Sequence, residues 1–152
     1  MKHIIEGCLI KYDVLMRDGR KIMRGAFKDC DGTKIPVCKS FAPNVNEVLG
    51  NATLIEKEDG VYYTAEIELA EDNEDRLVCD CIRNSGYRFG MFANQLKEKK
   101  RVIQFGVIRY MSLTAPCDAA GCIISLDGEK VYFQPMKADN IESRQHKCTE
   151  AI

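Results

Sequence analysis

Alternating apolar and polar residues run through much of this chain and predict β-strands. The clearest case is residues 61–69, where every second side chain is apolar, a period typical of a half-buried strand. The Glu-Asp-Gly turn at residues 58–60 joins this strand to a second one at residues 47–57, and together they predict a hairpin. Residues 87–96 and 102–114 predict a longer hairpin around the charged turn between them. The chain is therefore expected to be mainly β.

Short segments beside tight turns add further strands. Asp-Gly pairs at residues 18–19, 31–32 and 127–128 mark these turns, because aspartate and glycine tolerate the positive φ that tight turns require. The additional strands are predicted at residues 4–12, 35–38, 122–126 and 130–133, and a short segment at residues 21–27 ends in Gly-Ala-Phe.

The hydrophobic period changes at residues 72–84, which predict the one clear helix. Acidic residues gather at its start, where they suit the positive end of the helix dipole. The Asn-Ser-Gly sequence at residues 84–86 suits its end. Its apolar side chains recur at the spacing of one helix face: Leu77, Val78, Cys81 and Ile82.

Length and composition indicate one α+β domain. The chain has 152 residues, of which 45% are hydrophobic and 30% charged, with a net charge of −1. That balance gives no sign of nucleic-acid binding, and no apolar stretch approaches the roughly 20 residues that cross a membrane. With no signal peptide at its charged start, we expect a cytosolic protein. Residues 1–134 are expected to form the domain, and residues 135–152 a polar tail or short helix.

The eight cysteines raise the question of a metal or a disulfide framework. Their spacings include C-x7-C, C-x-C and C-x4-C, but no C-x2-C pair of the kind common in zinc sites. The two histidines, His3 and His146, both lie near the ends of the sequence. We therefore expect scattered free thiols with neither a metal nor another cofactor, and a small metal- or thiol-using module remains as an alternative.

Short motifs between residues 4 and 126 follow one another in a familiar order. They are I-E-G at residues 5–7, D-G-R at 18–20, G-A-F at 25–27, I-P-V at 35–37, V-L-G at 48–50, E-D-G-V-Y at 58–62, A-N-Q-L-K at 93–97 and I-R-Y-M-S-L at 108–113, followed by a loop of small residues at 116–121. In this order and spacing, they resemble the prohead (head-maturation) serine proteases of tailed bacteriophages.

The resemblance implies a β-barrel-like fold of the type shared with herpesvirus assemblins. It also implies a catalytic histidine in the loop after residues 35–38 and a serine in the strand after the helix. These positions fall at or near Phe41 and at Gly90. Phenylalanine has no proton acceptor and glycine has no nucleophilic atom, so neither can perform the chemistry. Losing one such group costs a serine protease about 10⁴–10⁶ in rate, so we expect no catalytic residues.

Other nucleophiles are less well placed by the sequence. Ser112 lies within a strand pattern, and it would need a base, for example His146 near the end of the sequence folded back onto it. Cys38, Cys79 and Cys81 have no base that the sequence places beside them. These residues keep open the alternative of an active serine endopeptidase with unrecognised catalytic residues.

The function expected from the resemblance is that of a catalytically inactive homologue, or pseudo-protease, encoded by a phage or prophage. It would have a structural or assembly role in the phage head and bind the major capsid or scaffold protein. We expect no nucleic-acid or membrane partner, and a homo-oligomer is left open. The expected location is the cytoplasm of the bacterial host or the interior of the prohead. The alternatives are an active endopeptidase that processes capsid or scaffold proteins and a small cysteine-based metal-binding module. No binding residues are predicted.

Overall fold

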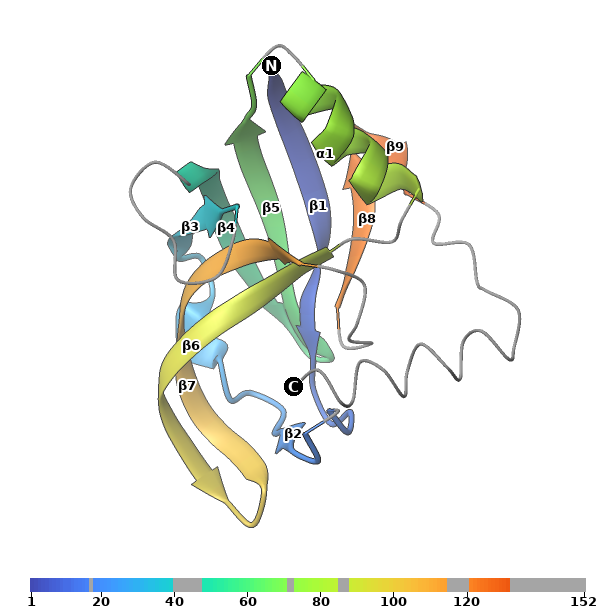
Figure 1. The fold of residues 1–152 in the computed structure, drawn as a ribbon. Coiled ribbons are helices and arrows are strands. Elements are labelled where there is room, and N and C mark those ends of the chain that lie inside the picture. The colour runs from blue at the N-terminus through green and yellow to red at the C-terminus, as the bar shows by residue number, and fades with distance from the viewer. Residues whose placement is uncertain (17, 40–47, 71–72, 85–87, 115–120, 132–152) are drawn as a thin grey trace, which may run out of the picture.

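The fold is a bent β-sheet with one α-helix packed beside it (Figure 1). The computed structural model describes residues 1–16, 18–39, 48–70, 73–84, 88–114 and 121–131. In chain order the elements are β1 (Lys2–Lys11), β2 (Lys21–Ile22), the 3₁₀ turn η1 (Lys28–Cys30), β3 (Lys34–Cys38), β4 (Val48–Lys57), β5 (Gly60–Glu68), α1 (Asn73–Asn84), β6 (Arg88–Lys99), β7 (Val102–Thr114), β8 (Cys122–Leu126) and β9 (Glu129–Lys130). The predicted tail at residues 135–152 lies outside these ranges.

The strands follow the order β2-β7-β3-β4-β5-β1-β8-β9, and β6 pairs with β7 alone. The prediction of a mainly β fold is confirmed, but the sheet of the described residues is not closed into a barrel as expected. Closure requires the strands at the two ends of the order to pair with each other. Those strands, β2 and β9, have two residues each and lie toward opposite ends of the molecule (Figure 1). The path therefore stays open.

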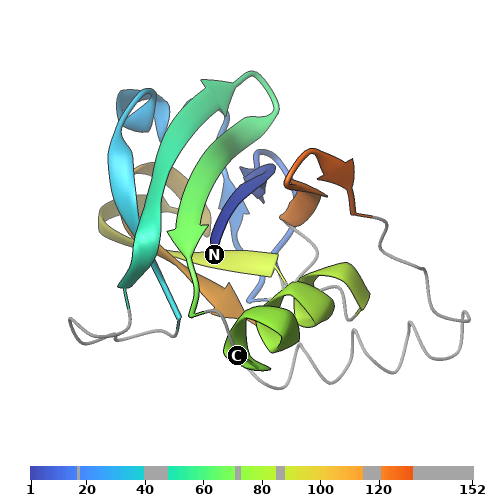
Figure 2. The ribbon, with the colours of Figure 1, turned by 90° about the horizontal axis from the view of Figure 1, so that it is seen from above.

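The two predicted hairpins form and pack on each other through aromatic side chains. Seen from above, the β6–β7 hairpin lies across the β4–β5 hairpin as a second layer (Figure 2). The ring of Tyr63 in β5 meets that of Phe89 in β6 edge to face, with centroids 5.7 Å apart. In β5 the buried residues alternate with more exposed ones, as the hydrophobic pattern predicted. The core thus lies between the layers.

The helix forms where it was predicted, at Asn73–Asn84, but its buried face is shifted, because only Val78 and Ile82 of the four predicted residues are buried. Val78, Cys79 and Ile82 are buried, whereas Leu77 is 64% exposed and Cys81 only half-buried. Both predicted and observed faces have helical spacing, so local periodicity alone could not choose between them. The neighbouring strand decides the choice, because Cys79 contacts His3 of β1.

The short segment at residues 21–27 is a strand only at its first two residues. Gly25 takes a φ of +81°, and backbone hydrogen bonds from Ala26 to Met23 and from Lys28 to Gly25 turn the chain there. The turn places Phe27 in the core, where it is fully buried. The hydrophobicity of this segment therefore reflects a buried turn.

Two adjacent tyrosines on opposite faces of β5 predict opposite effects of losing a hydroxyl group. Tyr63 Oη is buried without a hydrogen-bond partner among the described residues, whereas Tyr62 Oη contacts Lys11 Nζ at 3.0 Å and Asp59 at 2.8 Å. A buried unsatisfied hydroxyl costs about 1–3 kcal/mol. We expect Tyr63→Phe to raise the free energy of unfolding by roughly 1 kcal/mol, and Tyr62→Phe to lower it slightly. Urea denaturation of both variants measures this, and a loss at Tyr63 would contradict it.

Tyr63 should also make the stability of the fold depend on pH in the alkaline range. Burial raises the pKa of Tyr63 well above its usual value, so the folded protein keeps this proton while the unfolded chain loses it above about pH 10. The contribution of Tyr63 to stability is therefore complete below about pH 10 and falls as pH rises further. Tyr63→Phe lacks this loss, so its advantage over the wild type should widen above that pH.

Candidate functional site

Gly90, the position predicted for the family's serine, lies in β6, which pairs with β7. It pairs with Ser112 of β7, and Ser112 pairs on its other side with Cys38, the last residue of β3. Neighbouring strands lie about 4.8 Å apart, so the backbones of Cys38 and Gly90 are roughly 10 Å apart. Phe41, the position predicted for the histidine, follows three residues after Cys38 and lies outside the described residues.

Ser112 is the one hydroxyl-bearing residue in this row of three, but its surroundings do not suit a nucleophile. Its side chain is 0% exposed, and its Oγ makes no hydrogen bond within the described part of the chain. A serine needs both access to the substrate and a base that takes its proton. The second predicted partner, His146, lies outside the described residues, and His3 is hydrogen-bonded to two carboxylates elsewhere.

A separate cluster of reactive side chains, here called the His3 cluster, consists of His3, Asp75, Cys79 and Asp127. His3 on β1 is 5% exposed. Its Nδ1 lies 2.6 Å from Asp127 Oδ2, and its Nε2 lies 2.5 Å from Asp75 Oδ1. Cys79 Sγ lies 3.6 Å from the same Nε2. The cluster thus surrounds both ring nitrogens of one imidazole.

Three elements bring the His3 cluster together. Asp75 and Cys79 are four residues apart on α1, so they lie on one helix face. β8 pairs antiparallel with β1, which brings the turn after β8 beside the start of β1. Asp127 in that turn accepts a hydrogen bond from the Ile4 N–H through Oδ1 at 2.8 Å, and this fixes the carboxylate next to His3. In Figure 1, α1, β1 and the β8–β9 hairpin meet at the upper end of the molecule.

The charges of the His3 cluster favour a protonated imidazole in the metal-free protein. Burial lowers the pKa of His3, but the hydrogen bonds and charges of Asp127 and Asp75 outweigh it, and the pKa is raised overall. Burial also raises the pKa of the Cys79 thiol, and the charge of Asp75 adds to this effect. The two carboxylates therefore favour a proton on the imidazole, and burial favours the neutral form of the thiol.

The order Cys79, His3, Asp127 has the connectivity of a nucleophile, base and orienting acid. The sequence placed no base beside Cys79, and the structure brings His3 next to it. However, Asp75 occupies the same ring nitrogen more closely, and Cys79 is only 4% exposed. A reactive thiol needs an accessible site and a lowered pKa, and Cys79 has neither. Covalent catalysis by this thiol is not supported.

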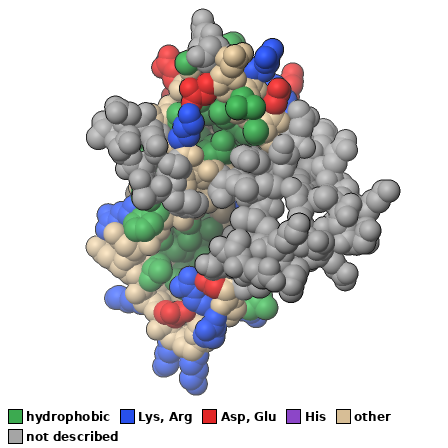
Figure 3. Space-filling view, in the orientation of Figure 1, with side chains coloured by type: hydrophobic (Ala, Val, Ile, Leu, Met, Phe, Trp, Pro, Cys, Tyr) green, Lys and Arg blue, Asp and Glu red, His purple; other side chains and the backbone are tan. Residues whose placement is uncertain are grey.

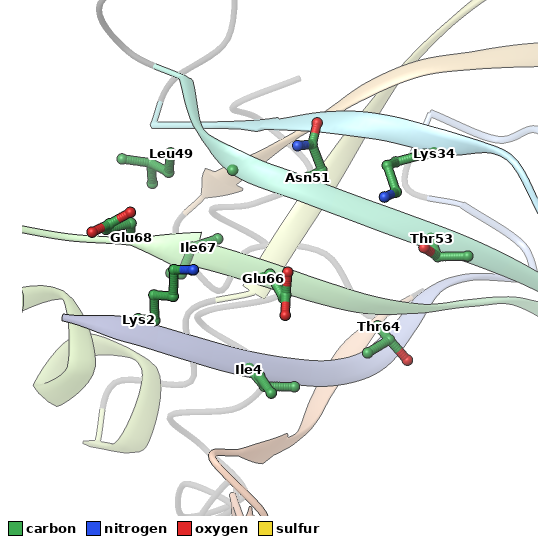
Figure 4. A pocket seen from close by; sticks show the side chains of 11 residues that line it. Lys2, Ile4, Lys34, Leu49, Asn51, Thr53, Thr64, Glu66, Ile67 and Glu68 are labelled. Atoms are coloured by element: carbon green, nitrogen blue, oxygen red, sulfur yellow. The ribbon is translucent and has the colours of Figure 1, made fainter.

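The solvent-facing side of the sheet carries a shallow polar hollow of about 350 Å³. It crosses β1, β5, β4 and β3, and Glu66 lies near its middle with Lys2 and Lys34 on either side (Figure 4). Its lining contains threonine, asparagine, lysine and glutamate but no serine, cysteine or histidine. The hollow can therefore offer hydrogen bonds and charges to a partner.

A second charged feature lies at the tip of the β6–β7 hairpin. Lysine and arginine side chains gather at the lower end of the molecule (Figure 3). Lys100 and Arg101 form the turn with φ values of 52° and 62°, and Arg101 donates to the backbone oxygens of Asp18 and Gly19. This charged turn is thus fixed to the neighbouring Asp-Gly turn.

Comparison with models of known protein families, with curated proteins and with solved structures found no match to this chain. Fold and geometry define a mainly β protein with one helix, without a helix among the described residues that is long and apolar enough to span a membrane. The particular function is therefore inferred from the residues themselves.

The His3 cluster was missed by the sequence reasoning, which set both histidines aside because they lie near the ends. A partial signal was present, since Asp75 and Cys79 have the spacing of one face of the predicted helix. Asp127 stood in a predicted turn. The pairing of β1 with β8, which joins these two halves, had no local signal.

Proposed function

We propose that this protein is a catalytically inactive relative of the prohead proteases of tailed bacteriophages. In this proposal it keeps the framework of the protease and assists head assembly by binding the major capsid or scaffold protein. It would act in the cytoplasm of the bacterial host and within the prohead. The observation that carries the proposal is the glycine at position 90, where the resemblance requires a serine.

The strand arrangement supports the assignment of this position. A base and a nucleophile must come within hydrogen-bond reach of each other during catalysis. Gly90 lies in the strand after α1, and only β7 separates this strand from the end of β3. Side chains of ordinary length from these two places could meet across β7. With glycine at one place and Phe41 at or near the other, the frame has no acyl-transfer chemistry.

The direct test uses the purified protein and the capsid and scaffold proteins encoded by the same phage or prophage. We expect one of them to co-elute with this protein in size-exclusion chromatography and to remain intact on a gel after prolonged incubation. The matched control is an unrelated capsid protein, which should not co-elute. Absence of binding to both cognate proteins, or site-specific cleavage abolished by a serine-protease inhibitor, would overturn the proposal.

A fluorophosphonate probe should leave the folded protein unlabelled. The probe reacts with activated serines, and Ser112 is buried and has no base among the described residues. Labelling is read by fluorescence on a gel and by mass spectrometry. Label that disappears in Ser112→Ala but persists in Ser125→Ala, a serine of β8, would instead favour the active endopeptidase.

A further inference from the structure

We propose that His3, Asp75 and Cys79 bind one divalent transition-metal ion of the zinc type, with Asp127 as the carboxylate that orients His3. The proposal is independent of the function proposed above, because these residues lie outside the row of Cys38, Ser112 and Gly90. It also replaces the expectation that the chain binds no metal.

The three donor atoms already converge on one point. His3 Nε2, a carboxylate oxygen of Asp75 and Cys79 Sγ all lie within 4.8 Å of one another. Tetrahedral zinc with its usual bond lengths separates nitrogen and sulfur ligands by about 3.6 Å, and nitrogen and oxygen ligands by about 3.4 Å. The observed Nε2–Sγ distance is 3.6 Å. The Nε2–Oδ1 distance of 2.5 Å must widen by about 1 Å, which a rotation of the Asp75 side chain can provide.

Asp127 has the position of an outer carboxylate in a histidine metal site. Histidines that bind metals usually donate their other ring N–H to a carboxylate, which fixes the tautomer and the ring orientation. Asp127 Oδ2 lies 2.6 Å from Nδ1, and its Oδ1 is held by the Ile4 N–H. A proton on Nδ1 leaves the lone pair of Nε2 directed toward Asp75 and Cys79. Asp127 thus prepares the histidine to act as a ligand.

A divalent ion would take the place of two protons in the His3 cluster. Metal binding displaces the protons of Cys79 and of Nε2, because ligands bind as thiolate and neutral imidazole. The thiolate and the Asp75 carboxylate then supply two negative charges against the two positive charges of the ion. Sulfur and nitrogen ligands favour zinc and cobalt over magnesium and calcium, which prefer oxygen.

Such an ion would join parts of the chain that are far apart in sequence. It would connect the start of β1 directly to α1, and through Asp127 also to the β8–β9 turn. Three protein ligands leave one tetrahedral position for water. Because these ligand positions exist together only in the folded chain, binding free energy adds to folding stability.

The test uses the reduced full-length protein, stripped with a chelator and titrated with Co²⁺ and then Zn²⁺. We expect one equivalent of Co²⁺ to bind with a thiolate-to-cobalt charge-transfer band, which Zn²⁺ then abolishes by displacement. Zn²⁺ should also raise the melting temperature. The absence of stoichiometric metal in equilibrium dialysis of the wild type would overturn the proposal, whatever the variants show.

Paired substitutions on α1 distinguish the proposed ligands from nearby residues of the same type. Cys79→Ser should lose the charge-transfer band and Cys81→Ser should keep it, since Cys81 lies outside the cluster. Asp75→Asn should weaken Zn²⁺ binding, whereas Asp80→Asn should not. Asp127→Asn should weaken it about 10- to 100-fold, as expected of an outer partner. Equal loss in Cys79→Ser and Cys81→Ser, with both folded by circular dichroism, would contradict the assignment.

Discussion

Phe27→Ala is expected to lower the free energy of unfolding by about 3–5 kcal/mol, as full truncation of a buried phenylalanine does in other proteins. The ring of Phe27 is 0% exposed. A Cβ placed on Gly106 of β7 would lie 2.6 Å from its Cε1, so the ring packs directly on the backbone of the long hairpin. Removing it leaves a cavity between the turn after β2 and β7, which these backbones cannot easily fill.

Phe92→Ala makes the same chemical change at an exposed site and serves as the control. Phe92 is 44% exposed, and its ring stacks on Tyr110 with centroids 5.0 Å apart. Loss of such a pair is worth about 0.5–1.5 kcal/mol. Urea denaturation followed by circular dichroism gives both values. A loss at Phe27 no larger than that at Phe92 would show that Phe27 does not fill the core.

Local patterns predicted those parts of the fold that local forces determine. The alternation in β5 reflects one buried and one solvated face. The turn at residues 58–60 makes β4 the hairpin partner of β5. The helix was predictable because its period and its acidic start occur within one short segment. Each of these features depends on residues that are neighbours in the sequence.

The order of the strands could not be predicted in this way. β7 pairs in parallel with both β2 and β3, and β1 lies between β5 and β8. Such pairings join residues many positions apart, and hydrophobic patterns do not state which strand pairs with which. The barrel was expected from the resemblance to a protease family. The structure instead shows an open order with very short strands at its ends.

The two candidate sites differ in how far the sequence could predict them, again because local patterns do not show which strands pair. Gly90 was predicted to lie in a strand after the helix, and it does lie in β6. Its role as the former nucleophile position stays a prediction. The His3 cluster joins residues that are 72 and 124 positions apart from His3. It appears only once β1, α1 and β8 have been placed together.

Gly50→Ala is expected to cost about 3 kcal/mol, at the upper end of the effects of overpacking. A Cβ at this position would lie 1.9 Å from the backbone oxygen of Glu66 in the neighbouring strand. A side chain could rotate away from such a contact, but a backbone carbonyl of the sheet cannot. β4 and β5 must therefore separate near the pair of Gly50 and Ile67, and hydrogen bonds between them weaken.

Gly32→Ala is the control, because this glycine is needed for its positive φ and not for lack of space. Gly32 has a φ of +77°, and apart from its own residue and its two chain neighbours no atom of the described residues lies within 4 Å of the Cβ that alanine would add. Its cost is that of the left-handed conformation alone, about 1–2 kcal/mol. Hydrogen exchange adds a local readout, because Gly50→Ala should speed the exchange of amides near Gly50 and Ile67, whereas Gly32→Ala should leave them protected. The prediction is contradicted if the two variants have the same free energy of unfolding and neither changes amide hydrogen exchange near Gly50 and Ile67. That result would mean that β4 and β5 do not approach each other as closely as the backbone contact at Gly50 requires.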